Sequence, residues 1–234
     1  MEISDYKYRT ELHAHTSPAS ACGHIPAKEL VHKYKELGYD SLVITNHFAD
    51  YSVSDKSQKT EFIKKYLTDF YDAKNEGDKI GINVILGAEL RFSESANDYL
   101  FFGVKEDEFS DIFEYLWNGV ENFSKNYKKE NQLLIQAHPF RDGMIQDYIS
   151  YMDGIEVFNM CPGANSRIAL AAKLAKKSNG YIIGGSDCHE YGLEGLIAML
   201  TKNEIKTGEE LVDTIKSKDY LFEFETSIIN PYGV

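Results

Sequence analysis

The sequence predicts a single α/β domain whose parallel strands close into a barrel. Short apolar runs alternate with helical stretches along the 234-residue chain, a pattern typical of parallel strands joined by helical crossovers. Side chains able to bind a metal follow six of the seven main expected strands, and such strand ends converge at the C-terminal mouth of a barrel. An open doubly wound sheet is the alternative, but no Gly-rich phosphate-binding fingerprint follows the first strand.

The first half of the chain supplies three strands and two helices. An apolar run ending at His13 is the first strand, and a helix over 26–37 follows, with Pro26 in its first turn and Gly38 as its stop. The apolar run 41–45 is the second strand. Aromatic and aliphatic residues at helical spacing indicate a long helix over 58–74, and 82–86 is the third strand.

The second half continues the alternation. Its expected strands cover 99–104, 133–137, 154–158 and 181–183, with a short additional strand near 220–224. Its expected helices cover 112–123, 165–177 and 209–217, each with apolar residues on one face. No linker or low-complexity segment interrupts the pattern, so we expect one domain over residues 1–234.

Composition limits the partners and the location. The net charge of −12 argues against broad binding to nucleic acid, which needs clustered Lys and Arg. No run approaches the roughly 20 apolar residues of a membrane span, and the polar N-terminus does not resemble a signal peptide. Three scattered cysteines, Cys22, Cys161 and Cys188, fit a reducing cytoplasm. Neither nucleic acid nor a membrane is therefore expected as a partner, and no oligomeric state follows from the sequence.

A His-x-His pair closes the first expected strand. His13 and His15 lie two residues apart, and side chains at that spacing face the same side of a strand. Two imidazoles so placed can bind one cation, provided that other ligands arrive from elsewhere. Candidates of the same kind stand in loops or at strand ends further along the chain: His24, His47, Glu89, His138, Asp187 and His189. Because eight such residues recur at corresponding positions, we expect a multinuclear metal site; His32, in mid-helix, is left outside it.

These residues resemble the motifs of the polymerase and histidinol phosphatase (PHP) family. The motifs stand here in the family's order over about residues 9–190: His-Ala-His-Thr at 13–16, Thr-Asn-His at 45–47, Gly-Ala-Glu at 87–89, His-Pro at 138–139 and Gly-Ser-Asp-Cys-His at 185–189. The resemblance implies a distorted, TIM-like (β/α)7 barrel that holds two or three divalent ions, usually Zn, Mn or Fe. It also implies a phosphoesterase.

The resemblance further implies how the ligands divide among the ions. One metal would take His13, His15, Glu89 and Asp187; Glu89 would bridge to a second metal that His138 also binds; a third would take His24, His47 and His189. Two departures stand out. Asn46 replaces the Asp that commonly precedes the second-strand histidine, and 102–105, after the fourth expected strand, lacks the histidine that some members have there. The second metal therefore has one protein ligand fewer.

The chemistry expected of such a centre is hydrolysis of a phosphomonoester on a small metabolite. Closely spaced metals hold an activated hydroxide at neutral pH and neutralise phosphoryl charge. Arg141 is the candidate catalytic and substrate-binding group, since guanidinium pairs well with phosphate. Arg91 and Arg167 are further candidates for substrate binding. Asn159 is expected either to orient substrate or water, or to cap the following turn.

Two other functions are compatible with the same residues. His-x-His after the first strand also marks amidohydrolases that break C–N bonds, and Lys105 could then be a carbamylated bridge between metals. The chain could instead be a metal-binding regulatory module without turnover, because fold and motif give no rate. Cys188 lies between two candidate ligands, but strand alternation turns it into the core, where it packs.

Overall fold

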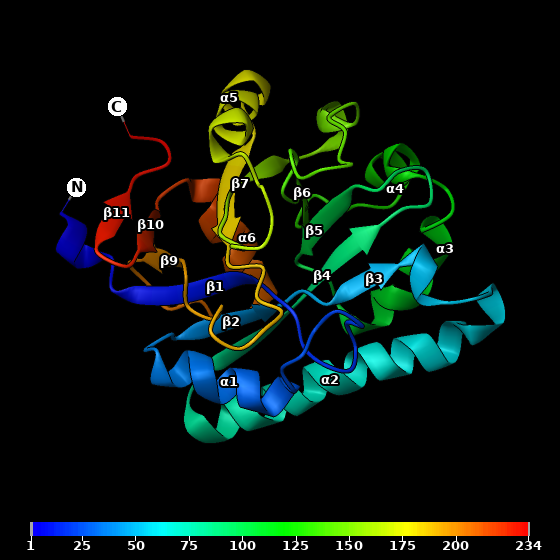
Figure 1. The fold of residues 1–234 in the computed structure, drawn as a ribbon, viewed down its shortest axis with the longest axis horizontal. Helices are drawn as coiled ribbons and strands as arrows, with labels where there is room; N and C mark the ends of the chain where they lie inside the picture. Colours follow the sequence, from blue (N-terminus) through cyan, green and yellow to red (C-terminus); the bar gives the residue numbers. More distant parts are fainter. Residues whose placement is uncertain (1, 234) are drawn as a thin grey trace.

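A computed structural model describes residues 2–233 and gives a mixed α/β fold built on one curled sheet (Figure 1). The strands are β1 Tyr8–Ala14, β2 Ser41–Ile44, β3 His47–Ala49, β4 Asn83–Arg91, β5 Asp98–Phe102, β6 Leu133–Gln136, β7 Gly154–Asn159, β8 Tyr181–Gly185, β9 Ala198–Thr201, β10 Leu221–Phe224 and β11 Ser227–Ile229. The α-helices of this range are α1 Ala27–Glu36, α2 Lys59–Ile80, α3 Phe109–Tyr115, α4 Val120–Asn126, α5 Ile168–Ser178 and α6 Gly208–Ser217.

The sheet is only partly parallel. Its order is β11-β10-β9-β1-β2-β4-β5-β6-β7-β8, with β3 paired to β4. The expected parallel pairing holds for β1, β2 and β4 and for β6, β7 and β8. It is wrong for β5, which runs antiparallel to both neighbours. The additional strand β9 is antiparallel to β1. The physical reason at β5 is the short connection 92–97, because a parallel crossover needs a dozen or more residues.

The two ends of the parallel region curl toward each other. An isolated parallel bridge joins Ala14 to Cys188, so the segment after β8 lies beside the end of β1. The result within residues 2–233 is a curled half-barrel whose continuous hydrogen-bonded path runs from β11 to β8. The carboxyl ends of β1, β2, β6, β7 and β8 therefore face one mouth, together with the start of β5.

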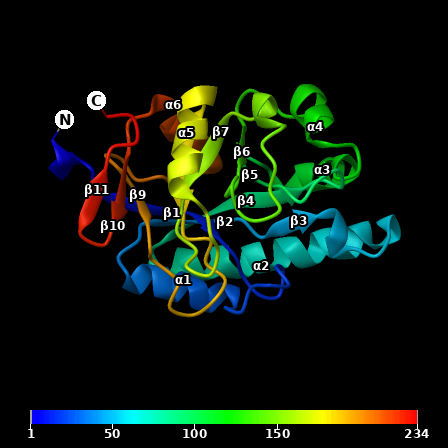
Figure 2. The ribbon, with the colours of Figure 1, turned by 45° about the horizontal axis from the view of Figure 1, so that its top comes forward.

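Helices cover both faces of this sheet (Figures 1 and 2). α1 and α2 lie side by side beneath β1, β2 and β4, where Leu30, Val31 and Tyr34 of α1 are buried in the main core. α6 packs against β4, β5 and β8 through Leu211, Val212 and Ile215 in a second apolar cluster. α5 covers β7. Burial of both faces explains why the strands are nearly continuous apolar runs.

Tyr66 of α2 connects this packing to the mouth of the sheet. Its ring is buried against Phe48 and Phe109, and its hydroxyl donates to the carbonyl oxygens of Asn46 at 3.1 Å and Gly87 at 2.9 Å. The two carbonyls lie directly before the segments that carry His47 and Glu89. One buried donor therefore fixes the spacing of two strands at the point where the candidate ligands begin.

Several element boundaries differ from the expectation. The helix expected over 112–123 is two helices, because Gly119 has φ of +84° and the Glu94 carboxylate accepts the Val120 N–H that opens α4. The third expected strand extends to Arg91, so Glu89 lies within β4 rather than after it. β3, β9 and β11 were not expected. No helix among residues 2–233 combines the length and the apolar character needed to cross a membrane.

Candidate metal centre

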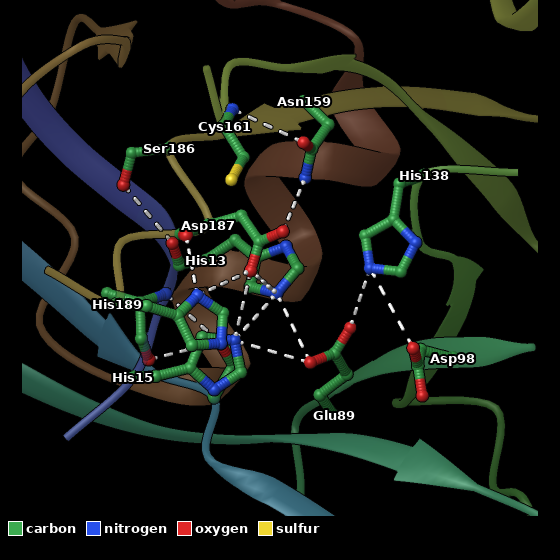
Figure 3. A network of polar contacts seen from close by, with 12 residues as sticks. His13, His15, Glu89, Asp98, His138, Asn159, Cys161, Ser186, Asp187 and His189 are labelled. Carbon is green, nitrogen blue, oxygen red and sulfur yellow. Dashed lines mark hydrogen bonds and ion pairs between the residues drawn. The ribbon is translucent and has the colours of Figure 1, made fainter. Parts of the chain in front are cut away.

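Seven of the eight candidate ligands meet at the mouth of the sheet. Each comes from the end of a strand or the loop beside it: His13 and His15 from β1, His47 from β3, Glu89 from β4, His138 after β6, and Asp187 and His189 after β8. Figure 3 labels all of them except His47. His13, His15, Glu89, His138 and Asp187 are at most 1% exposed. The residues form three groups, and within each group the ligand atoms all lie within 4.8 Å of one another. The groups are His13, His15, Glu89 and Asp187; His15, His47 and His189; and His47, Glu89 and Asp98.

Two carboxylate oxygens are each surrounded by imidazole nitrogens without being hydrogen-bonded. Glu89 Oε2 lies 3.5 Å from His13 Nε2, 3.3 Å from His15 Nε2 and 3.0 Å from His47 Nδ1. Asp187 Oδ1 lies 3.3 Å from His13 Nε2 and 3.3 Å from His15 Nε2. Both oxygens are buried and lack a hydrogen-bond partner among the described residues. Imidazole nitrogens that converge on two carboxylate oxygens left without a hydrogen bond fit a bound cation.

The histidines are held from behind by other polar groups. His13 Nδ1 lies 2.8 Å from Glu156 Oε1, His15 Nδ1 lies 3.1 Å from Ser20 Oγ, and His189 Nδ1 lies 2.8 Å from the Asp187 carbonyl oxygen. His13 Nε2 and His15 Nε2 then face each other at 3.1 Å. An outer partner on one ring nitrogen fixes the tautomer and turns the other nitrogen toward a metal. This donor set, imidazoles with two carboxylates, suits divalent metal ions.

Comparison with known proteins agrees with this geometry. The PHP domain family model matches residues 11–227. The chain belongs to the PHP family. No curated protein matches the sequence itself.

Solved structures share the fold of this PHP domain at low sequence identity. A two-domain protein from Bacteroides vulgatus, described as containing a predicted PHP-like metal-dependent phosphoesterase, aligns with a TM-score of 0.66 and 16% identity over 97% of this chain and 68% of that one. A proposed metal-dependent phosphoesterase from Bifidobacterium adolescentis aligns with a TM-score of 0.51 and 15% identity, over 78% and 88% of the two chains. An amidohydrolase from Chromobacterium violaceum, with bound sulfate and no metal, gives 0.52 and 14% over the same shares. At these identities the likeness concerns the fold alone.

The backbone of the PHP domain is shaped to present its ligands. Gly185 packs so tightly that an added Cβ would lie 2.3 Å from His13 Cβ. Glu11 Oε1 accepts the backbone N–H groups of Leu12, His13 and Ser186 at 2.9–3.0 Å, at the irregularity where the pairing of β1 with β2 shifts register. A buried carboxylate that gathers three N–H groups holds the end of β1 in one shape; burial raises the pKa of Glu11.

The pKa shifts divide these candidate ligands into two kinds, those with a raised pKa and those with a lowered pKa. Burial opposes the charge on His13 and His47, but the carboxylates around them, Glu156 and Asp187 for His13 and Glu89 for His47, raise the pKa of both imidazoles well above the usual value. Burial likewise opposes the charge on Glu89 and Asp187, but the adjacent histidines hold both pKa values well below the usual range. Burial and the neighbouring His15 lower the pKa of His189 to about 3. Protons therefore compete with a cation for the imidazole nitrogens of His13 and His47.

Two further candidates, His24 and Lys105, lie apart from the cluster, as does His32, which was left outside the predicted site. His24 is close in backbone, since its N–H donates to the His189 carbonyl, but its side chain is 62% exposed and faces Glu190 at 3.8 Å. The structure therefore does not bring it among the ligand groups. His32 pairs with Glu76 on the helix surface, at 3.0 Å. Lys105 is exposed beyond the far end of β5, because β5 runs antiparallel, so a carbamylated lysine bridge to Glu89 does not fit this fold.

The four candidate substrate groups differ in where they lie. Arg141 reaches the centre: its Nη2 donates to Asp187 Oδ2 at 2.5 Å and to Asn159 Oδ1 at 3.0 Å. Asn159 is 3% exposed and also donates to Glu156 and Asp187, so it orients neighbours rather than facing a substrate. Arg91 makes two 2.6 Å bonds to Asp98. Arg167 donates to the carbonyl of Phe140 and the carboxylate of Asp142, and so holds the loop that carries Arg141.

Two site carboxylates were not predicted. Glu156 lies inside an apolar run, where nothing in the sequence separates it from a surface position, yet it is fully buried behind His13. Asp98 begins β5, and only the direction of that strand brings it to the mouth. Asn46 is explained as a loop anchor: its Oδ1 accepts from Thr16 N at 2.7 Å and Ser20 Oγ at 2.9 Å, while its Nδ2 donates to Thr16 Oγ1. An Asp there could not make the last bond.

Proposed function

We propose that this PHP domain is a metal-dependent phosphomonoesterase that acts on a small phosphorylated metabolite. The observation that carries the proposal is the pair of buried, unbonded carboxylate oxygens of Glu89 and Asp187, each facing imidazole nitrogens, with the Arg141 guanidinium beside Asp187. We propose two or three divalent ions, Zn, Mn or Fe, on these ligands, and a distorted (β/α)7 barrel as the parent fold. When bound, such ions supply an activated water and neutralise phosphoryl charge.

The residues of the chain then have distinct roles. Glu156 and Asn159 hold His13 and Arg141 in place through bonds of 2.8 Å and 3.0 Å. Arg141 keeps one nitrogen on Asp187, while its Nε is buried and has no hydrogen-bond partner among the described residues. A guanidinium that is 24% exposed beside a metal ligand is suited to bind a non-bridging phosphoryl oxygen.

The rest of the substrate has a place beside the ligands. A cavity of about 430 Å³ adjoins His47 and is lined by Tyr51, Val53, Phe62 and Lys65, among others. Ligand pockets for small molecules have volumes of this order, with apolar walls and a few polar groups. We propose that it receives the alcohol portion of the monoester.

Three free cysteines support a reducing, cytoplasmic location.

Assays on metal-loaded protein test the proposal. Protein reloaded with Mn²⁺ or Zn²⁺ and assayed with p-nitrophenyl phosphate is expected to release p-nitrophenol, and His13→Ala is expected to lose both metal and turnover. His32→Ala, a surface histidine paired with Glu76, is the matched control and should keep both. Full metal loading without hydrolysis of any ester in a phosphomonoester panel would contradict the proposal and favour the regulatory module.

Hydrolysis of a C–N bond is the second candidate. The Chromobacterium violaceum neighbour is described as an amidohydrolase, and it holds sulfate, a tetrahedral anion similar in shape to phosphate. A panel of amide and phosphomonoester substrates, run on the same metal-loaded sample, separates the two candidates. We expect turnover of the phosphomonoesters alone.

A further inference from the structure

The second metal position lacks a ligand in the sequence-based assignment. Only Glu89 and His138 were available for it, because no histidine follows the fourth expected strand. In the structure that strand, β5, runs antiparallel to β4, with Glu89 opposite Leu100 and Arg91 opposite Asp98. The residues after β5 therefore lie far from the mouth of the sheet, and the first residue of β5, Asp98, lies near the mouth. The missing ligand should be sought at the start of the strand.

Asp98 lies where such a ligand would stand (Figure 3). Its side chain is 4% exposed, and its Oδ2 lies 3.9 Å from His138 Nε2, which in turn lies 3.0 Å from Glu89 Oε1. Ligand atoms of His47, Glu89 and Asp98 also fall within 4.8 Å of one another. Four elements, β3, β4, β5 and the loop after β6, thus bring two carboxylates and two imidazoles close to one another.

Unsatisfied atoms of His47 and Glu89, two residues with ligand atoms within 4.8 Å of Asp98, point to a cation beside it. His47 Nδ1 and Glu89 Oε2 are buried and lack a hydrogen-bond partner among residues 2–233, although they lie 3.0 Å apart. Leaving a buried polar group unpaired costs roughly 1–3 kcal/mol. A divalent ion on these atoms would remove that cost for both.

The competing explanation is that Asp98 serves only as the partner of Arg91. Arg91 Nε and Nη2 donate to Asp98 Oδ1 and Oδ2 at 2.6 Å each, and the guanidinium also lies over the Tyr51 ring at 5.0 Å. A carboxylate has about four lone-pair sites, so two bonds to Arg91 leave one site on each oxygen for a metal. Ligating carboxylates in metal sites are themselves usually hydrogen-bonded from behind.

We propose that Asp98 is a metal ligand that completes the second position with Glu89 and His138, and that Arg91 orients it from behind. The strand's reversed direction replaces a histidine after the strand with a carboxylate at its beginning. The added negative charge suits a divalent cation with mixed nitrogen and oxygen ligands, such as Mn²⁺, Fe²⁺ or Zn²⁺. This proposal rests on the metal centre proposed above and not on the reaction that it performs.

Metal binding by four variants tests the proposal without an activity assay. Apo protein is titrated with Mn²⁺ and with Zn²⁺ by calorimetry, and bound equivalents are measured by elemental analysis after gel filtration. Asp98→Asn is expected to lose about one equivalent or to bind it at least tenfold more weakly. Asp98→His breaks the Arg91 ion pair but restores a ligand, so it should keep the equivalent. Arg91→Gln should also keep the full number of equivalents, with weaker binding at one position.

The pattern across the variants separates a metal ligand from a simple ion-pair partner. Asp153→Asn is the matched control. It removes an ion pair in which Asp153 lies 3.1 Å from Lys128, away from the metal centre, and it should bind metal as the wild type does. Wild-type equivalents and affinity in Asp98→Asn would overturn the proposal. Equal loss in Asp98→Asn, Asp98→His and Arg91→Gln would assign Asp98 to the ion pair and overturn it too. If Asp98→Asn does not fold, judged by circular dichroism without metal, Asp98→His and Arg91→Gln still distinguish the two roles. Both variants keep the equivalent if Asp98 is a metal ligand, and both lose it if Asp98 serves only the ion pair.

The same samples keep this proposal apart from the proposed function. Loss of the equivalent in Asp98→Asn supports the ligand whether or not wild-type protein hydrolyses phosphomonoesters. A wild-type chain that hydrolyses them with a single bound equivalent would overturn the ligand and leave the function standing.

Discussion

Glu156→Gln tests how the centre is held, because the substitution preserves shape and removes one acceptor. Glu156 receives three donors: His13 Nδ1 at 2.8 Å, the His138 N–H at 2.9 Å and Asn159 Nδ2 at 3.0 Å. A glutamine has one acceptor oxygen and one NH₂ group. If the glutamine oxygen takes the place of Oε2, it still accepts from the His138 N–H and from Asn159 Nδ2. Its NH₂ group then faces His13 Nδ1, so that nitrogen must accept a hydrogen bond instead of donating one. The proton moves to His13 Nε2, the nitrogen that faces Glu89 and Asp187.

The magnitude follows from that change of tautomer. Loss of an outer partner typically lowers metal affinity 10–100-fold, about 1.4–2.7 kcal/mol at 25 °C. The other orientation of the amide leaves the donors of His138 and Asn159 facing NH₂, an unsatisfied pairing that costs roughly 1–3 kcal/mol of stability in the metal-free protein. For a chain of this size each kcal/mol lowers Tm by about 2–4 °C.

The assay is competition for Zn²⁺ against a calibrated chelator, together with a thermal melt of the apo protein. Glu108→Gln is the matched control, because Glu108 is also a buried carboxylate that accepts from Gln132, but it lies at the far end of β5. It should lower Tm and leave Zn²⁺ affinity unchanged. A folded Glu156→Gln with wild-type affinity would refute the tautomer argument.

Three further outcomes are expected. Arg141→Met should lower kcat on a phosphomonoester about 10²–10³-fold, the usual loss for one preorganised donor, with metal content by elemental analysis unchanged; equal losses of metal and rate would limit Arg141 to holding Asp187. His24→Asn should keep every metal equivalent, since its side chain is 62% exposed, and loss of one would return it to the ligand set. Apparent Zn²⁺ affinity should keep rising with pH above 7, because the pKa values of metal-free His13 and His47 lie well above the usual 6.5. Protons on these imidazoles compete with the ion until the pH exceeds those pKa values. A plateau from pH 7 upward in chelator competition would contradict this.

The sequence predicted which residues lie together at the mouth because most of these candidate ligands follow a regular rule. His13, His138 and Asp187 stand at the carboxyl ends of parallel strands, each after an apolar run. Their spacing from the strand is local, so it can be deduced without the fold. Glu156 could not be found in this way, since a carboxylate within a strand faces the site or the solvent according to packing that the sequence does not state. The direction of the His24 side chain could not be predicted for a similar reason: a loop fixes the place of a backbone but not the direction of a long side chain.

Strand direction was the remaining error, and it had a readable cause. Only six residues, 92–97, separate β4 from β5, too few for a parallel crossover, so the pair had to be antiparallel. Reversing β5 moves Lys105 to the far end and brings Asp98 to the mouth, opposite Arg91. The same reversal removes the carbamylated-lysine alternative and supplies a carboxylate where the motif lacked a histidine. In a mixed sheet, ligands therefore have to be sought after parallel strands and before antiparallel ones, and the length of each connection tells which rule applies.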